Sequence, residues 1–203
     1  MVARLLSIVA VTAALAIPVP GWAQAEAPDA LVKRVSSDVL DAVRADKSIQ
    51  SGDVRKVVAL VDAKVLPSFD FARMTASAVG PAWSKATPDQ QKQLQEEFKI
   101  LLVRVYSGAL AQGTDRTLEV KPFRDAGGKE VVVRTEIRGG GDVIPMNFRL
   151  ENTDAAWKIY DINISGVWLV DNYRNTFASE INASGVDGLV AKLKDKNKSN
   201  AAR

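Results

Sequence analysis

Apolar residues recur every three to four positions through the first half of the chain, which is the spacing of one face of an α-helix. One such stripe consists of Leu31, Val32, Val35, Val39 and Val43, and a second of Val54, Val57, Val58, Val61 and Val65. Proline cannot continue a helix, so Pro67 is expected to end the second stripe. The pattern predicts helices over most of residues 28–112.

Two further helices in this half carry their own boundary signals. A short helix is predicted for Phe71–Val79, with Gly80 as its C-terminal cap. The next has a capping hydroxyl at Thr87, a proline at the first helical position, and Gln90 three residues after the cap, which together are typical of a capping box. We expect this long helix to end near Gly113.

From Thr117 the period changes to two, which favours β-strands. The predicted strands are Thr117–Phe123, Glu130–Arg138, Val143–Asn152 and Ala156–Ile164. Short glycine-rich links favour an antiparallel meander. In the third strand four apolar side chains share one face, which predicts a sheet covered on one side. They are Ile144, Met146, Phe148 and Leu150.

The helical period returns over residues 167–196, and Gly185 is predicted to cap one helix before a last one begins. Helices, then strands, then helices indicate an α+β fold. We expect a curved antiparallel sheet of about four strands packed against N- and C-terminal helices.

The chain begins like a secreted protein. Arg4 precedes the weakly polar to apolar run 5–17, and the small residues Ala23 and Ala25 follow. The run is too short to span a bilayer, which takes about 20 apolar residues. We therefore expect a signal peptide at residues 1–25 and a soluble periplasmic domain at residues 26–203.

Composition removes several kinds of chemistry. The 203 residues include no cysteine and no histidine, and the formal net charge is +3. This excludes disulfides, a Ser-His-Asp triad and the usual zinc sites. The near balance of charge gives no support to nucleic-acid binding. Catalysis by carboxylates, lysine or tyrosine stays open.

A few polar residues remain candidates for function. Asp161 lies inside the fourth predicted strand, where acids are depleted. It is either a buried base in a cavity or the partner of an arginine or a backbone group. Tyr106, Tyr173 and Arg174 are either structural residues or contacts to the headgroup of a ligand.

Apolar side chains are more numerous than the strands and helices require, and in the fourth strand the alternation predicts large apolar groups on both faces. Trp157 and Ile159 should lie on one face, and Tyr160, Ile162 and Ile164 on the other. A strand of this kind is covered on both sides. The pattern leaves open a thick, filled core and a cavity for an apolar ligand.

Several stretches, taken in order, resemble the MlaC family of periplasmic phospholipid-binding (toluene-tolerance) proteins. They are Val65–Met74, Trp83–Gln91, Leu101–Tyr106, Trp157–Ile162, Gly166–Val167, Asn172–Arg174 and Gly185–Leu189. Together they span nearly all of residues 26–203. One departure is Trp168, where the family more often has serine; its indole could narrow a cavity mouth or pack outside.

The resemblance implies a nuclear-transport-factor-like core with extra helices and a deep apolar pocket for acyl chains. It implies no enzyme activity and no cofactor, with phospholipid as cargo. The implied partners are an outer-membrane lipoprotein and porin complex and an inner-membrane ABC transporter with a lipid-binding ring. The carrier would shuttle lipid between them and so maintain outer-membrane asymmetry.

We place the expected pocket between the covered face of the sheet and the long helix. Its predicted lining residues are Leu102, Val105, Tyr106, Val133, Ile144, Met146, Phe148, Leu150, Trp157, Ile159, Val167 and Tyr173. Two alternatives stay open: a cavity enzyme of the isomerase or cyclase kind, with Asp161 or Tyr106 as acid or base, and a structural adaptor with a filled core.

Overall fold

The strands of the sheet follow one another in chain order, each antiparallel to the next. The computed structural model describes residues 26–124, 127–153 and 156–199, so the expected signal peptide lies outside the described residues. The strands are β1 (Thr117–Val120), β2 (Glu130–Gly139), β3 (Asp142–Asn152), β4 (Trp157–Ile164) and the short β5 (Val167–Trp168). The α+β prediction is confirmed, and the described residues form one more strand than expected.

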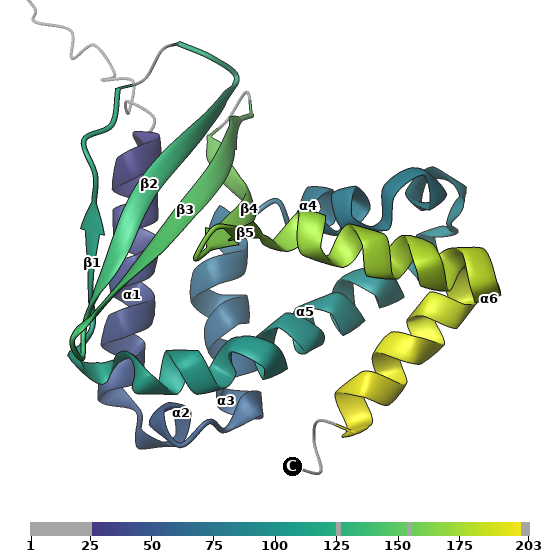
Figure 1. Ribbon diagram of the computed structural model, residues 1–203, viewed down its shortest axis with the longest axis horizontal. Helices are drawn as coiled ribbons and strands as arrows, with labels where there is room; N and C mark the ends of the chain where they lie inside the picture. Colours follow the sequence, from purple (N-terminus) through teal and green to yellow (C-terminus); the bar gives the residue numbers. More distant parts are fainter. Residues whose placement is uncertain (1–25, 125–126, 154–155, 200–203) are drawn as a thin grey trace, which may run out of the picture.

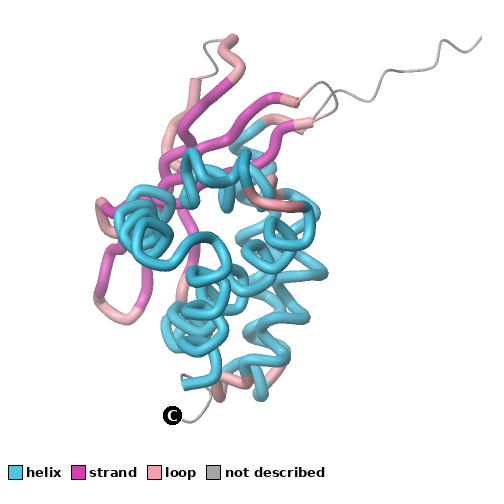
Figure 2. Tube along the Cα trace, turned by 90° about the vertical axis from the view of Figure 1, so that its right-hand side faces the viewer, coloured by secondary structure: helices cyan, strands magenta, loops and turns pink. Residues whose placement is uncertain are grey.

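The helices form two groups joined by the longest unbroken one, as Figure 1 shows. They are α1 (Pro28–Ala45), α2 (Lys47–Gln50), α3 (Val54–Leu60), α4 (Phe71–Val79), α5 (Pro88–Ala111) and α6 (Leu169–Ser199). α1 crosses one face of the sheet, whereas α4 and α6 extend away from the end of β5. α5 runs between these two parts. In the turned view of Figure 2 the strands lie along one side of the helices.

The predicted local signals for these helices are present. Thr87 accepts a hydrogen bond from the backbone of Gln90, whose side chain accepts one from the backbone of Thr87, so the capping box of α5 is confirmed. Gly80 ends α4 with a φ of 72°. Gly185 interrupts α6 with a φ of 73° and so separates two helical pieces, as predicted.

The predicted helix does not continue to Pro67. The α-helix α3 ends at Leu60, and two irregular helical turns follow it. Residues Val61–Val65 form a π-helical turn, and Leu66–Ser68, which includes Pro67, form a 3₁₀ turn. The chain then joins the sheet: Phe69 bridges to Ile159 in parallel, and the Asp70 N–H donates to the Ile159 carbonyl at 2.8 Å. This irregular segment is therefore fastened to β4.

The prediction that β4 is apolar on both faces is wrong, because a β-bulge interrupts it. Leu150 of β3 pairs with Ile159, but Arg149 pairs with Asp161, so Tyr160 is the extra residue. An extra residue shifts the alternation by one position. Trp157 and Ile159 before the bulge and Ile162 and Ile164 after it therefore all lie on the face of Met146, Phe148 and Leu150.

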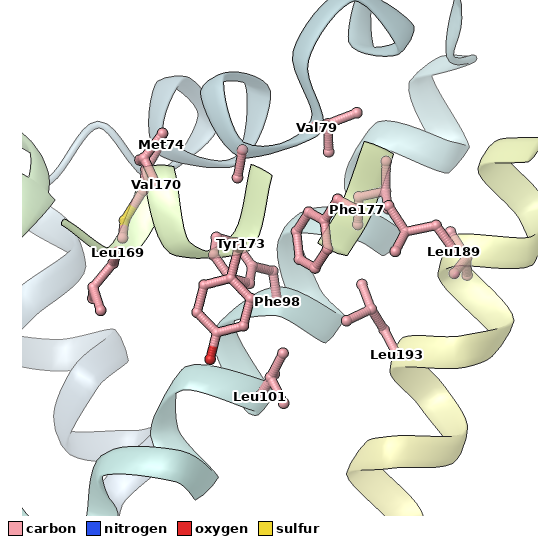
Figure 3. Packing of buried hydrophobic residues seen from close by; sticks show 13 residues of the cluster. Met74, Val79, Phe98, Leu101, Leu169, Val170, Tyr173, Phe177, Leu189 and Leu193 are labelled. Atoms are coloured by element: carbon pink, nitrogen blue, oxygen red, sulfur yellow. The ribbon is translucent and has the colours of Figure 1, made fainter. Parts of the chain in front are cut away.

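Among the described residues, buried apolar side chains form three clusters. The first joins α4, α5 and α6 through an aromatic group in which the rings of Tyr173 and Phe177 lie 5.0 and 5.2 Å from that of Phe98 (Figure 3). The second packs Leu31, Val32 and Val35 of α1 against the sheet. The third gathers α1, α2, α3 and the middle of α5. A cavity lies where side chains of these clusters meet.

Candidate functional site

A cavity of about 400 Å³ lies between the sheet, α3, α5 and the irregular segment after α3. Its wall on α5 runs from Lys99 to Leu110, a length of about 16 Å at the helical rise. The wall is almost entirely aliphatic and aromatic. It includes Val57, Val61, Val65, Leu66, Phe69, Phe71, Met74, Leu102, Val103, Tyr106, Leu110, Ile137, Ile144, Met146, Ile162, Ile164 and Leu169.

The covered face of the sheet divides between this cavity and the packed core. Toward one end, Val133, Phe148 and Leu150 are buried against α1. Toward the other end, Ile137, Ile144 and Met146 line the cavity opposite α5. Both sets share one face because Val133 pairs with Phe148, and Ile137 with Ile144.

Four of the residues predicted to line a pocket are in the cavity wall: Leu102, Tyr106, Ile144 and Met146. Five others, Val133, Phe148, Leu150, Trp157 and Ile159, belong to the cluster packed on α1. Tyr173 belongs to the helical cluster. Val105 and Val167 are 47% and 52% exposed, and neither is part of the wall.

Several wall residues were missed from the sequence. Ile137 shares the face of Ile144, so strict alternation along β2 could have found it. Ile162 and Ile164 were assigned to the wrong face because the bulge at Tyr160 has no clear signal in the sequence. The contributions of Val61, Val65 and Leu66 depend on the π-helical and 3₁₀ turns, which periodicity does not predict.

Two cationic side chains occur in the part of the cavity wall that the structure describes. Lys99 is buried on α5, with its ammonium group 2.9 Å from carboxylates of both Asp62 and Glu96. Arg116 follows the 3₁₀ turn after α5 and is 16% exposed. Its nearest carboxylate, that of Asp142, is 3.8 Å away.

The phenols near the cavity stay neutral. Burial, with a smaller effect of the neighbouring Tyr106, raises the pKa of Tyr173 to about 12. Burial also raises the pKa of Tyr106, which lies in the wall itself. Neither phenol is ionised at neutral pH, so neither adds a negative charge near the cavity.

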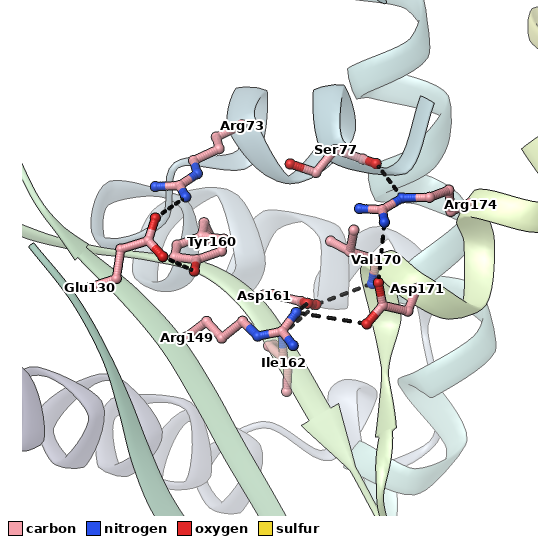
Figure 4. A network of polar contacts seen from close by, with 10 residues as sticks. All are labelled: Arg73, Ser77, Glu130, Arg149, Tyr160, Asp161, Ile162, Val170, Asp171 and Arg174. Carbon is pink, nitrogen blue, oxygen red and sulfur yellow. Dashed lines mark hydrogen bonds and ion pairs between the residues drawn. The ribbon is translucent and has the colours of Figure 1, made fainter. Parts of the chain in front are cut away.

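Asp161 is held by three donors, as Figure 4 shows. Its Oδ1 accepts from the N–H groups of Ile162 at 2.9 Å and Val170 at 3.1 Å, and its Oδ2 accepts from Arg149 at 2.9 Å. Val170 lies in the first turn of α6, where N–H groups lack helical partners. The carboxylate thus ties β3 and β4 to α6, which is the pairing role that the sequence left open.

Burial raises the pKa of the Asp161 carboxyl, and the N–H groups of Val170 and Ile162 and the charge of Arg149 oppose that rise. Asp161 is not part of the cavity wall. On the same side of the sheet as Arg149, the ring of Trp168 lies under the guanidinium group at 3.8 Å. The indole therefore packs on this polar network, and it too is absent from the wall.

A second arginine connects α4 to the sheet. Arg73 forms ion pairs with Glu130 and Glu151 and lies over the ring of Tyr160 at 3.7 Å. In Figure 4 this group and the one around Asp161 lie on neighbouring parts of the sheet. Arg174 of α6 donates to the carbonyl of Ser77 in α4 at 3.1 Å. These contacts give Arg73 and Arg174 structural roles.

Within residues 26–124, 127–153 and 156–199, no three histidine, cysteine or acidic residues gather in a way that could hold a metal ion. Over the same part of the chain, no helix has the length and apolar character needed to cross a membrane. Fold and cavity together define an α+β protein with an apolar internal pocket.

The comparisons with known proteins identify the family. The family model described as MlaC protein matches residues 33–195, and the chain belongs to this family. It is 26% identical over 165 residues to the toluene tolerance protein ttg2D of Pseudomonas putida, covering 80% of this chain and 77% of that protein. It is 19% identical over 171 residues to the intermembrane phospholipid transport system binding protein MlaC of Haemophilus influenzae, covering 82% and 80%.

A solved structure shares the fold. The phospholipid-binding protein from Ralstonia solanacearum, determined in complex with a phospholipid, is 44% identical to the chain and superposes with a TM-score of 0.82. The similarity covers 85% of this chain and 98% of that one.

Proposed function

We propose that the protein is a phospholipid carrier that holds an acyl chain in the cavity between the sheet and α5. The observation that carries this proposal is the cavity itself, which has an almost wholly apolar wall built from the sheet, α5 and the segment that runs from α3 to α4. Membership of the MlaC family and the 44% identity to a protein solved with a phospholipid support the same ligand.

The size of the cavity agrees with an acyl chain. At roughly 30 Å³ for each group of the size of a water molecule, about 400 Å³ accommodates about a dozen methylene groups. Each methylene contributes about 0.8 kcal/mol on leaving water, so burying them would stabilise the complex by about 10 kcal/mol. This free energy is enough to hold one acyl chain firmly. A second acyl chain would fit only if the wall moved, or would lie outside the cavity at its rim.

We place this function in the periplasm, after removal of the signal peptide expected at residues 1–25. The carrier would exchange lipid with an outer-membrane lipoprotein and porin complex and with an inner-membrane ABC transporter that has a lipid-binding ring. Such exchange would help to maintain the lipid asymmetry of the outer membrane. The family names support transport by this system.

A binding role without catalysis fits the polar groups of the site. The carboxylate of Asp161 is occupied by three donors away from the cavity. Tyr106 reaches the wall, but burial raises the pKa of its phenol and so makes it a weaker acid. We therefore assign no acid or base to the cavity.

The test is lipid extraction from protein purified without detergent, followed by mass spectrometry. We expect close to one phospholipid per chain. Leu102→Trp puts an indole into the cavity and should lower the bound lipid several-fold, whereas Val105→Trp changes an exposed neighbour on the same helix and should leave it unchanged. Wild-type protein that carries no lipid and takes none from phospholipid vesicles would disprove the proposal.

A further inference from the structure

The polar end of the cavity is unlike the rest of its wall. Directly after α5 the chain adds Gln112, Gly113 and Arg116 to the wall, from the turn between α5 and β1. Nη1 of Arg116 is buried and has no hydrogen-bond acceptor among the described residues. A buried donor of this kind costs free energy unless an acceptor reaches it.

The two cations of the wall differ in how they are neutralised. Two carboxylates lie within hydrogen-bond distance of the ammonium group of Lys99. Among the described residues, the guanidinium group of Arg116 has one carboxylate within 4 Å, that of Asp142, and their separation of 3.8 Å is too long for a normal hydrogen bond. Positive charge is therefore available to a ligand at Arg116 and not at Lys99.

The backbone of Arg116 is fixed from two sides. Arg44 of α1 donates to its carbonyl at 2.6 Å, and its own N–H donates to the carbonyl of Gly113 at 3.1 Å. At the end of β2, Gly139, with a φ of 141°, comes so close that an added Cβ would lie 2.5 Å from the carbonyl oxygen of Asp115. A guanidinium group on so fixed a backbone has less freedom to lose when it binds an anion.

We propose that Arg116 binds a phosphate oxyanion at this end of the cavity, with the apolar chain of the same ligand lying along α5. This rests on the proposed carrier function and adds the group that recognises the charged part of the ligand. Guanidinium and phosphate form paired, charge-assisted hydrogen bonds. The phosphate would belong to a lipid headgroup, and free phosphate supplies the same chemistry without the chain.

The experiment titrates delipidated protein with dodecyl phosphate, dodecanol and inorganic phosphate by calorimetry. Wild-type protein should bind dodecyl phosphate about tenfold or more tightly than dodecanol, as expected for a hydrogen bond to a charged group. This preference should shrink as salt is added. Inorganic phosphate should bind far more weakly, because it lacks the chain; tight binding that needs Arg116 would support the anion site and identify free phosphate as its source.

Arg116→Gln should remove most of the preference for dodecyl phosphate while dodecanol binds as before. Arg104→Gln is the matched control, since Nε of Arg104 is also buried without an acceptor in the described part of the chain, but Arg104 is not part of the wall. Melting curves check that both variants fold. The comparison of dodecyl phosphate with dodecanol in wild-type protein tests the proposal without any variant.

Equal affinity of wild-type protein for the two dodecyl compounds would overturn the role of Arg116 and leave the carrier function intact. A preference for dodecyl phosphate that persists in folded Arg116→Gln would also overturn the role of Arg116 and leave the carrier function intact. If wild-type protein bound neither dodecyl compound nor phospholipid, the carrier function itself would fail.

Discussion

Two residues on one face of β3 have different surroundings although they are only two positions apart. Phe148 is 6% exposed and belongs to the cluster packed on α1, whereas Met146 is half-buried and lines the cavity. Alternation along the strand predicts that they share a face, and they do. It does not tell which part of the face is covered by a helix and which by a cavity.

Aspartate at these two positions should therefore have different effects. Phe148→Asp would bury an unpaired charge in a filled core, at a cost of several kcal/mol from a total stability of about 5 to 15 kcal/mol. Met146→Asp would put the charge in a cavity that water can enter, so the protein should remain folded and lose bound lipid. Thermal melting and lipid extraction measure both.

Met146→Leu is the control, since it keeps the wall apolar at similar size. Two results would contradict this division of the face: unfolding by Met146→Asp, or a folded Met146→Asp that keeps its full lipid content.

The tyrosines give a second test at the scale of single residues. Burial raises the pKa of each of Tyr106, Tyr160 and Tyr173, and that of Tyr173 to about 12. An unfolded chain loses these protons near pH 10, so the native state binds more protons above that pH and stability should fall as pH rises from about 10 to 12.

In a pH titration, phenolate absorbance of the folded protein should accordingly rise at higher pH than that of the urea-unfolded chain. Tyr173→Phe should make the alkaline loss of stability smaller, as measured by urea unfolding at about pH 9 and about pH 11. Coincident titration curves for folded and unfolded protein would contradict the burial of these phenols.

Among the elements, helix boundaries with a capping signal were the most predictable and the walls of the cavity the least. The start of α5 and the break at Gly185 depend on local capping and on a positive φ, and both are visible in the sequence. The π-helical turn Val61–Val65 and the bulge at Tyr160 arise from packing between distant segments. The periodicity of the sequence indicates neither the π-helical turn nor the bulge, so the prediction based on it misplaced part of the cavity wall.

The attachment of α6 to the sheet depends on one carboxylate. Asp161→Ala would leave Arg149 and the N–H of Val170 without their acceptor, at a cost of about 2 to 4 kcal/mol. Asp161→Asn keeps an acceptor for the N–H group and should cost less. Denaturant unfolding with lipid extraction distinguishes this structural role from a catalytic one, because bound lipid should be unchanged in either folded variant.

Asp171→Ala is the matched control. Asp171 lies 3.8 Å from the same arginine but is 52% exposed, so its loss should cost less than about 1 kcal/mol. An equal cost for the two alanine variants would show that Asp161 does not tie the elements together.

At the scale of the whole molecule, an apolar cavity makes stability depend on cargo. A ligand at a hundred times its dissociation constant stabilises the folded state by about 2.7 kcal/mol. For a domain of this size that corresponds to an increase in Tm of about 5 to 10 °C. Lipid-loaded protein should melt higher than stripped protein by this amount, as measured by calorimetry.

Leu102→Trp provides the comparison, because its indole occupies the space that lipid would fill. Its Tm should differ little between loaded and stripped preparations. The same Tm for stripped and loaded wild-type protein would mean that the lipid is not held inside the fold.

The bulge at Tyr160 also limits how this chain can change in evolution. Substitutions along β4 alter one side chain at a time, but loss or gain of one residue between Ile159 and Ile162 would turn one end of the strand over. Either Trp157 and Ile159 would leave the core, or Ile162 and Ile164 would leave the cavity. Among proteins that share this pocket, the number of residues in that interval should be constant even where their identities differ.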